Sequence, residues 1–279
     1  MRNLLSANFL RLRKSGIFWF LLLVHFAFGT VFTVHRVRDQ MRWEEWGAWG
    51  ARFYLTVDLF VYALLLGFGM AVFIPLFFGA EYSDGAIRNK LIIGHSRLSV
   101  YLSHLITSVA VAALAAAAYL APVLAIGVFA YEPPDMDAGT LLLLLLGTLA
   151  LLAAYCALYT FIVMNWGNKS RAAVICLTVM LVLYLAAGNI DTSLMHPEYM
   201  FTEITDSGEI IYGDPNPRYV DGAKRQALET LYDLLPTGQS IQYMRVKVNH
   251  PARLTLCSLM DTAALTALGA ALFRRKDIK

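Results

Sequence analysis

The chain has 279 residues, of which 58% are hydrophobic and only 15% charged, and its formal net charge is +3. This composition excludes an ordinary soluble domain, and the charge is too small to indicate a nucleic-acid partner. The apolar residues gather in blocks of about 20 residues, the length at which a helix crosses hydrocarbon. Composition therefore predicts an all-α polytopic membrane protein.

The chain begins with a short basic segment, residues 1–16, whose leucines recur at roughly helical spacing. This pattern is typical of a helix that lies on the cytoplasmic surface of a membrane. The apolar run 17–34 is too long for a signal-peptide core, and no small-residue cleavage site follows it. We therefore expect the first spanning helix at 17–34.

A polar stretch, residues 35–54, separates this helix from the next apolar block. It contains Trp43, Trp46 and Trp49, which recur every three residues along one helical face. Indole rings prefer the headgroup region, so the stretch is expected to lie along the outer membrane interface. The later spanning helices are predicted at 55–78, 100–130, 140–164, 172–188 and 254–273.

These patterns divide the chain into four parts. A surface helix at 1–16 precedes the first five spanning helices at 17–188, which enclose a cytoplasmic loop at 79–99. An extracytoplasmic insert at 189–253 follows, and 254–279 holds the sixth helix and a basic tail. Of the 23 Lys and Arg residues, 13 fall in the segments assigned to the inside, 4 in the two short outside loops and 6 in the insert. The positive-inside rule then predicts that both termini are cytoplasmic.

The insert is expected to be folded. Two β-prone runs in 199–212 flank Asp206-Ser207-Gly208, which predicts a hairpin with a glycine turn. Asp221 could cap a helix that runs to Leu235 and is stopped by the Pro-Thr-Gly sequence at 236–238. Two interpretations remain open: a packed external cap, or an element that gates the release of substrate.

The cytoplasmic loop carries the most informative pattern. Ile87 and Leu91 are spaced i,i+4 and flank Arg88 and Lys90, which are expected to be exposed. A short amphipathic helix here would present charge to the cytosol and apolar side chains to the bundle. An ordinary positive-inside loop explains the same residues, so the pattern alone does not distinguish such a loop from an amphipathic helix that contacts a partner.

Residues 81–97, EYSDGAIRNKLIIGHSR, resemble the loop after the second helix in type-2 ABC exporter permeases, written E-x-x-x-G-[TA]-I-R-N-K-L. The ending FRRKDIK is also similar to that family's usual close. The resemblance implies an ATP-driven exporter with two permease chains, identical or similar, and two separate ATPase subunits. It further implies that the loop is the coupling helix that sits in a groove of the ATPase. Its residues here are Glu81, Gly85, Ile87, Arg88, Asn89 and Lys90.

The chain itself lacks the sequence features of an enzyme. It contains no GxxxxGK[ST] phosphate loop, so ATP and Mg²⁺ are expected to bind through the partner ATPase rather than to this chain. There is no HExxH or GxSxG motif, and the three cysteines do not have metal-ligand spacing. We expect a transport subunit without its own cofactor or metal.

Three ionisable residues fall within predicted spanning helices, where such groups usually face the bundle interior or a wet cavity. Asp261 in the sixth helix could form a helix or subunit hydrogen bond, line the substrate route or couple protons. His25 in the first helix is interpreted as a packing residue. Asp58 lies near the outer end of the second helix, where access to water favours an interfacial role.

The leading hypothesis is a permease that exports an amphipathic or hydrophobic substrate, such as a peptide, an antimicrobial, a drug or a lipid. We expect it to be a multi-pass protein of a bacterial cell (inner) membrane, in contact with membrane lipid. One alternative is an ion- or proton-coupled carrier that uses Asp261 and His25. Another is a membrane sensor whose external insert binds a ligand.

Overall fold

A computed structural model describes the chain at residues 1–45, 53–204, 210–248 and 250–276. Within these residues, six helical segments are long and apolar enough to cross a membrane. The prediction of an all-α membrane protein with six spanning helices is therefore confirmed.

Five of the six spans are single uninterrupted helices. Each begins or ends beyond the apolar block that predicted it, because polar residues at its ends continue the helical hydrogen bonding. They are α2 (Gly16–Glu45), α7 (Arg97–Ala130), α8 (Ala138–Trp166), α9 (Lys169–Met195) and α12 (Pro251–Arg275).

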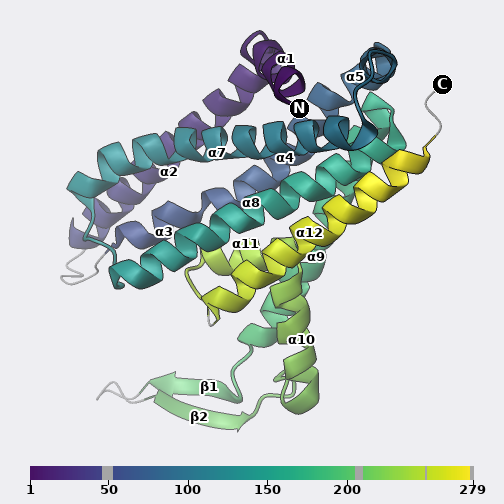
Figure 1. Cartoon of the computed structure of the whole chain (residues 1–279). Helices are drawn as coiled ribbons and strands as arrows, with labels where there is room; N and C mark the ends of the chain where they lie inside the picture. The colour runs from purple at the N-terminus through teal and green to yellow at the C-terminus, as the bar shows by residue number, and fades with distance from the viewer. Residues whose placement is uncertain (46–52, 205–209, 249, 277–279) are drawn as a thin grey trace.

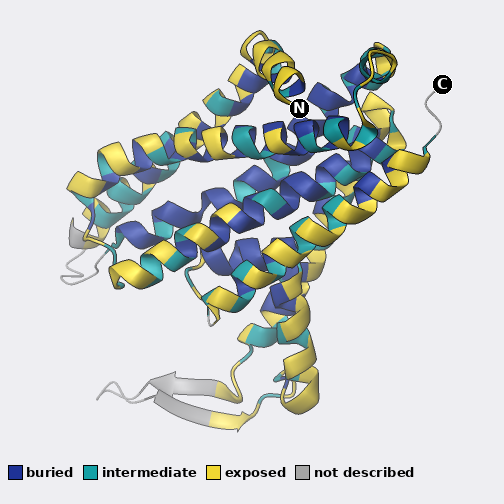
Figure 2. Cartoon of the chain, in the orientation of Figure 1, coloured by how far each residue is buried: buried dark blue, intermediate teal, exposed yellow. Residues whose placement is uncertain are grey.

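The second span is built from three consecutive helices, α3 (Leu55–Phe60), α4 (Tyr62–Phe78) and α5 (Ala80–Ser83). The α4 segment lies at the centre of the bundle and contacts α2, α7, α8 and α9. Most of its residues are buried, as its dark colour in Figure 2 shows. A helix that is apolar on all sides is expected in this central position.

The first helix continues further than expected. Residues 35–45 extend α2 and do not form a separate interfacial segment, so the boundary predicted at residue 35 is wrong. The charged side chains there find partners on or beside the helix: His35 lies 3.0 Å from Asp39, and Arg36 lies 2.8 Å from Asp58. Trp46 and Trp49 lie outside the described residues.

One end of the bundle carries more than half of the Lys and Arg residues of the chain. The short helices α1 (Arg2–Arg13) and α6 (Ala86–Ile92) lie there together with α5 and the last turn of α12, at the top and upper right of Figure 1. We call this the basic end. The opposite end, which carries the segment between α9 and α12, is called the insert end.

The insert combines a strand pair with two helices. β1 (Tyr199–Ile204) and β2 (Ile210–Pro215) pair antiparallel, in agreement with the two predicted runs, while the predicted turn at 206–208 lies outside the described residues. They project from the bundle at the bottom of Figure 1. The helix α10 (Gly222–Leu234) follows, with Asp221 at its N-cap position. The predicted capping bond is wrong, because the Asp221 side chain makes no hydrogen bond there.

The second helix of the insert enters the bundle. α11 (Pro236–Met244) begins at the proline that was expected only to stop α10, and nearly all its residues are buried. It packs against α4, α8 and α9. Its glutamine side chains are satisfied within the protein: Gln239 donates to the Asp233 carbonyl and Gln242 to the Asp233 carboxylate. The insert is thus part of the core and not only a cap over it.

Ion pairs fasten the insert to the spanning helices. Arg245, directly after α11, lies 2.7 Å from Asp191 on α9. Arg253 on α12 lies 3.1 Å from Asp233 on α10. Because these pairs join α9 to the end of α11 and α10 to α12, the helical part of the insert is held firmly on the bundle.

The helices α8 and α12 form the most extensive helix pair of the chain. They approach closely at Gly147, where an added Cβ would meet Tyr243 Oη of α11 and Thr255 Oγ1 of α12. Small residues at such crossings allow neighbouring backbones to come together in a membrane.

We expect Gly147→Ala to lower the free energy of unfolding by about 1–3 kcal/mol, the usual cost of overpacking a filled site. Gly188→Ala on α9 is the matched control, because nothing lies within 4 Å of a Cβ built there. The control should leave stability unchanged or raise it by up to about 1 kcal/mol. Thermal unfolding of both purified variants in detergent measures the difference, and equal effects would contradict the close packing at Gly147.

Candidate functional site

The segment between α4 and α7 forms a compact two-helix turn at the basic end. α5 continues from α4, and the chain then reverses at Gly85, whose φ of 67° lies in the left-handed region that glycine adopts without strain. α6 follows, and its Ile87 is buried in an apolar cluster with Leu4, Tyr101 and Phe273. The amphipathic helix predicted from the Ile87–Leu91 spacing is therefore present, with Ile87 on its inner side.

Glu81 is the centre of this site. Its side chain is almost completely buried, and its Oε2 atom lies 2.7 Å from Lys90 Nζ and 2.9 Å from His104 Nε2. Its other oxygen, Oε1, pairs with Arg11. A buried carboxylate is tolerated only when it is paired and hydrogen-bonded, so these contacts hold three separate elements to α5.

The N-terminal helix is bound to the same cluster. Arg11 donates a 2.9 Å hydrogen bond to the Phe77 carbonyl and lies 4.1 Å above the Phe77 ring. Asn8 donates to the Ser103 carbonyl and to Thr107 Oγ1 on α7. α1 is therefore fastened to the ends of both α4 and α7.

A second group of contacts ties the C-terminal end of α12 to this site. Tyr82 donates to the Met164 carbonyl, and Lys276 Nζ donates to the same oxygen over 3.1 Å while lying 4.4 Å from the Tyr82 ring centre. Burial, with a smaller contribution from nearby Arg171, lowers the pKa of Lys276. Arg97 at the start of α7 donates to the Phe273 carbonyl. Five elements thus converge around α5 and α6.

The outer face of α6 makes none of these contacts. Arg88 and Asn89 are exposed, and so are two large apolar side chains that follow, Ile92 at 72% and Ile93 at 77%. Lys90 was expected to share this face, and that expectation is wrong. Its ammonium group turns inward because the buried Glu81 carboxylate requires a counter-charge.

Asp58 does not have the access to water that its position suggested. It is completely buried, and Arg36 of α2 lies 2.8 Å from it. The Arg36 guanidinium also lies over the rings of Phe53 and Tyr131. The predicted interfacial role is therefore replaced by a buried ion pair between the first two spans.

His25 and Asp261 are not brought together. His25 is buried on α2, where its Nδ1 lies 2.8 Å from the Leu21 carbonyl, and it lines an apolar groove of about 280 Å³ between α2 and α4. Asp261 is half-buried on α12, which packs on α7, α8 and α10. One of its oxygens has no hydrogen-bond partner among the described residues.

Sequence reasoning missed Arg11, Asn8 and His104 as members of the site. They lie between 23 and 73 residues from Glu81 in the chain, so no helical spacing relates them to it. The only available signal was chemical: an acid at the end of an apolar span needs cations nearby. The basic segment at 1–16 was the obvious source, but its orientation toward Glu81 depends on the folded arrangement.

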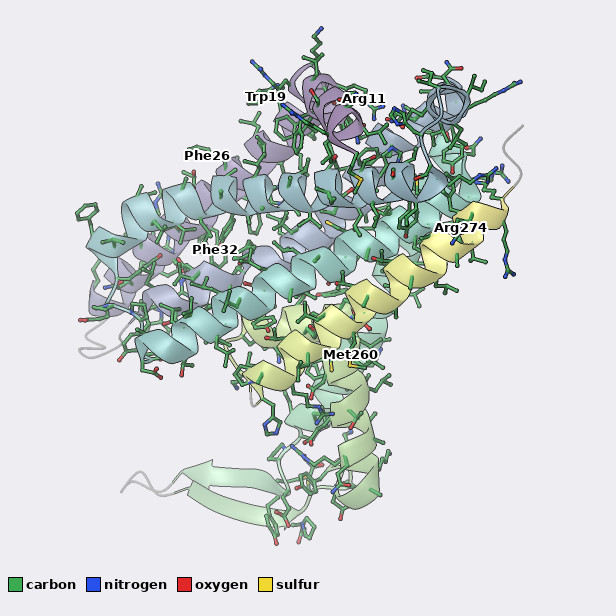
Figure 3. The ribbon with its side chains drawn as sticks, viewed as in Figure 1. Arg11, Trp19, Phe26, Phe32, Met260 and Arg274 are labelled. Carbon is green, nitrogen blue, oxygen red and sulfur yellow. The ribbon has the colours of Figure 1, made fainter. Side chains whose placement is uncertain are left out.

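The end of the bundle thus presents an exposed face on α6 whose opposite side is fixed to the spanning helices (Figure 3 labels Arg11 on α1 and Arg274 on α12 at the same end of the bundle). A search of curated proteins gives no match to the chain. Residues 4–187, however, match the family described as ABC-2 family transporter protein. This match covers the surface helix, the first five spans and the whole α5–α6 segment, about two thirds of the chain. The chain therefore belongs to the ABC-2 transporter family, as a membrane permease component.

Proposed function

We propose that the chain is the permease of an ATP-driven exporter and that the exposed face of α6 binds a separate ABC ATPase. The observation that carries this proposal is the two-sided character of α6. Arg88, Asn89, Ile92 and Ile93 are free to contact a soluble partner, whereas Ile87 and Lys90 are fixed inside the protein. A partner that moves α6 would move the attached helices with it.

The charge distribution supports an orientation with the basic end in the cytoplasm. The basic end contains α1, the α5–α6 turn and the end of α12, and segments rich in Lys and Arg remain on the cytoplasmic side of a membrane. In this orientation the insert end faces outward. ATP and Mg²⁺ would then be held by the ATPase on the cytoplasmic side, directly below α6.

Glu81 is the proposed mechanical link. Because its carboxylate joins α1, α6 and α7 to the end of the central span, a displacement of α6 cannot occur without a displacement of these elements. Coupling between distant sites is carried by such contiguous networks of packed and paired side chains. A movement of α6 on closure of the ATPase pair would therefore be transmitted to α4, the most buried span, through the ion pairs of Glu81.

The transport route is proposed to lie between two permease copies. α4 occupies the middle of a single chain, so the bundle centre is filled by side chains. The spans α2, α9 and α12 keep broad apolar faces exposed, and only about a quarter of each is buried within the chain. These faces suit lipid, a second copy and an amphipathic or hydrophobic cargo such as a peptide, a drug or a lipid.

We expect Arg88→Glu to weaken ATPase binding on the order of tenfold or more, because a reversed charge would face the partner's complementary surface. The chain would be co-expressed with the ABC ATPase of its transporter and purified through a tag on the permease. Co-purified ATPase and its rate of ATP hydrolysis are the measurements.

Arg13→Glu is the matched control for this experiment. Arg13 is also an exposed arginine at the basic end, but it lies on α1 and outside the α6 face. The control should retain the ATPase. If both variants retain it equally, α6 is not the docking surface; if both lose it, general charge at this end and not α6 determines binding.

Glu81→Gln tests the internal link separately from the docking surface. Removing the carboxylate leaves Arg11 and Lys90 without their shared counter-charge, so we expect the free energy of unfolding to fall by about 3–5 kcal/mol. Asp84→Asn removes an exposed charge one turn away and should change it by less than about 0.5 kcal/mol. Thermal unfolding in detergent measures both.

At a temperature where the Glu81→Gln variant stays folded, we expect it to bind the ATPase but to move less substrate for each ATP hydrolysed. A normal ratio of transport to hydrolysis would contradict the proposed link.

The carrier alternative makes a different prediction for Asp261. Because Asp261 and His25 lie on helices that pack in different parts of the bundle, we expect Asp261→Asn to keep ATP-dependent transport within about twofold of wild type. Transport of a fluorescent amphipathic substrate into inverted vesicles would be measured with and without ATP. Complete loss of transport, with the protein still folded, would favour proton or ion coupling.

A further inference from the structure

A cavity opens at the basic end. It lies between the start of α7 and the end of α12, has a volume of about 390 Å³ and is lined by Ser96, Arg97, Leu98 and Arg274. Nothing in the coupling mechanism uses this cavity. Its lining combines two guanidinium groups with one exposed leucine.

The two arginines lack a negative counter-charge among the described residues. The guanidinium of Arg97 is bound to two backbone carbonyls of the α12 terminus, those of Phe273 and Lys276. These bonds fix the position of the group but do not neutralise it. Arg274 is exposed, and no described carboxylate lies within ion-pair distance of it. The cavity therefore concentrates positive charge at a fixed point.

One apolar side chain, Leu98 at the start of α7, lines the cavity beside the two arginines. Leu98 is exposed, and Leu268 and Leu272 are exposed on α12 outside the cavity, on a different face of the helix from Arg274. Exposed leucines on a spanning helix face lipid chains. The arginines accordingly lie where the hydrocarbon ends and the headgroup layer begins.

We propose that this cavity binds the phosphate of an anionic phospholipid. Arg97 and Arg274 would contact the phosphate oxygens, since a guanidinium matches phosphate geometry with paired hydrogen bonds. The acyl chains would extend past Leu98 toward the spanning part of α7. Basic pockets between spanning helices on the cytoplasmic side are suited to anionic headgroups. The inference requires only that α7 and α12 span a membrane, so it does not depend on the coupling proposal.

The same chemistry could attract a carboxylate of the ATPase instead. The exposed Leu98 in the cavity wall favours the lipid, because it offers an acyl chain an apolar contact directly beside the two guanidinium groups. The lipid also explains why each arginine stands at the end of an apolar helix, Arg97 at the start of α7 and Arg274 in the last turn of α12. The ATPase remains a distinguishable outcome of the experiment below.

Native mass spectrometry of the full chain in detergent tests the proposal, with phosphatidylglycerol and phosphatidylcholine as the lipid probes. We expect the wild type to retain phosphatidylglycerol preferentially and Arg274→Gln to bind it about fivefold more weakly, the effect of one basic group near an anionic lipid surface. Arg275→Gln is the matched control, because Arg275 is equally exposed and carries the same charge but does not line the cavity. It should stay within about twofold of wild type, and Arg274→Lys should recover most of the binding.

Two further arms identify the source of the phosphate. Glycerophosphoglycerol and inorganic phosphate carry the charge without acyl chains, so we expect them not to compete with phosphatidylglycerol at equal concentration. Competition by either would overturn the lipid assignment. Equal losses in the Arg274 and Arg275 variants would also overturn it, since the cavity would then be irrelevant. Unchanged lipid binding in Arg274→Gln with reduced ATPase co-purification would reassign the cavity to the protein partner.

Discussion

The structure depends on one electrostatic constraint, the burial of the Glu81 carboxylate at the end of the central span. A charge withdrawn from water needs opposite charges and hydrogen-bond donors at close range, because the protein interior does not solvate it. Arg11, Lys90 and His104 supply these groups from α1, α6 and α7. The positions of the surface helix and of the α5–α6 turn are consequences of this requirement. A single acidic side chain thus organises the whole basic end.

The opposite end obeys the same rule with different residues. Asp58 pairs with Arg36, Asp191 with Arg245 and Asp233 with Arg253, and each pair joins two different elements. Between the two ends the contacts are apolar or neutral, such as the hydrogen bonds between Tyr62 and Thr148 and between Tyr155 and Ser240. Charge therefore fixes the ends of the bundle, and close packing fixes its middle. In a membrane this division is expected, since ionic groups are tolerated best near the aqueous boundaries.

The sequence predicted the features that depend on local pattern. The six spans followed from apolar block length, and the inner position of Ile87 followed from its spacing to Leu91. The failures concern pairing over long distances. Lys90 was assigned to the surface and Asp58 to water, because a helical period cannot reveal a buried partner on another helix. The entry of α11 into the core was missed for the same reason. Its glutamines and serine are polar and suggest an exposed helix, and only their hydrogen-bond partners on other elements explain their burial.

The filling of the bundle centre limits how a single chain can act. Glycines and alanines on α4, α7 and α8 let the spans pack closely, and a row of buried tyrosines occupies the remaining space. Protein interiors of this density do not deform continuously; they move as packed bodies that shift between discrete arrangements. The rigid ionic cluster at the basic end suits such a movement, because it would carry α1, α6 and the end of α4 together. A passage for cargo is then more readily made between two such bodies than through one. The exposed apolar faces of α2, α9 and α12 are the surfaces along which it would form.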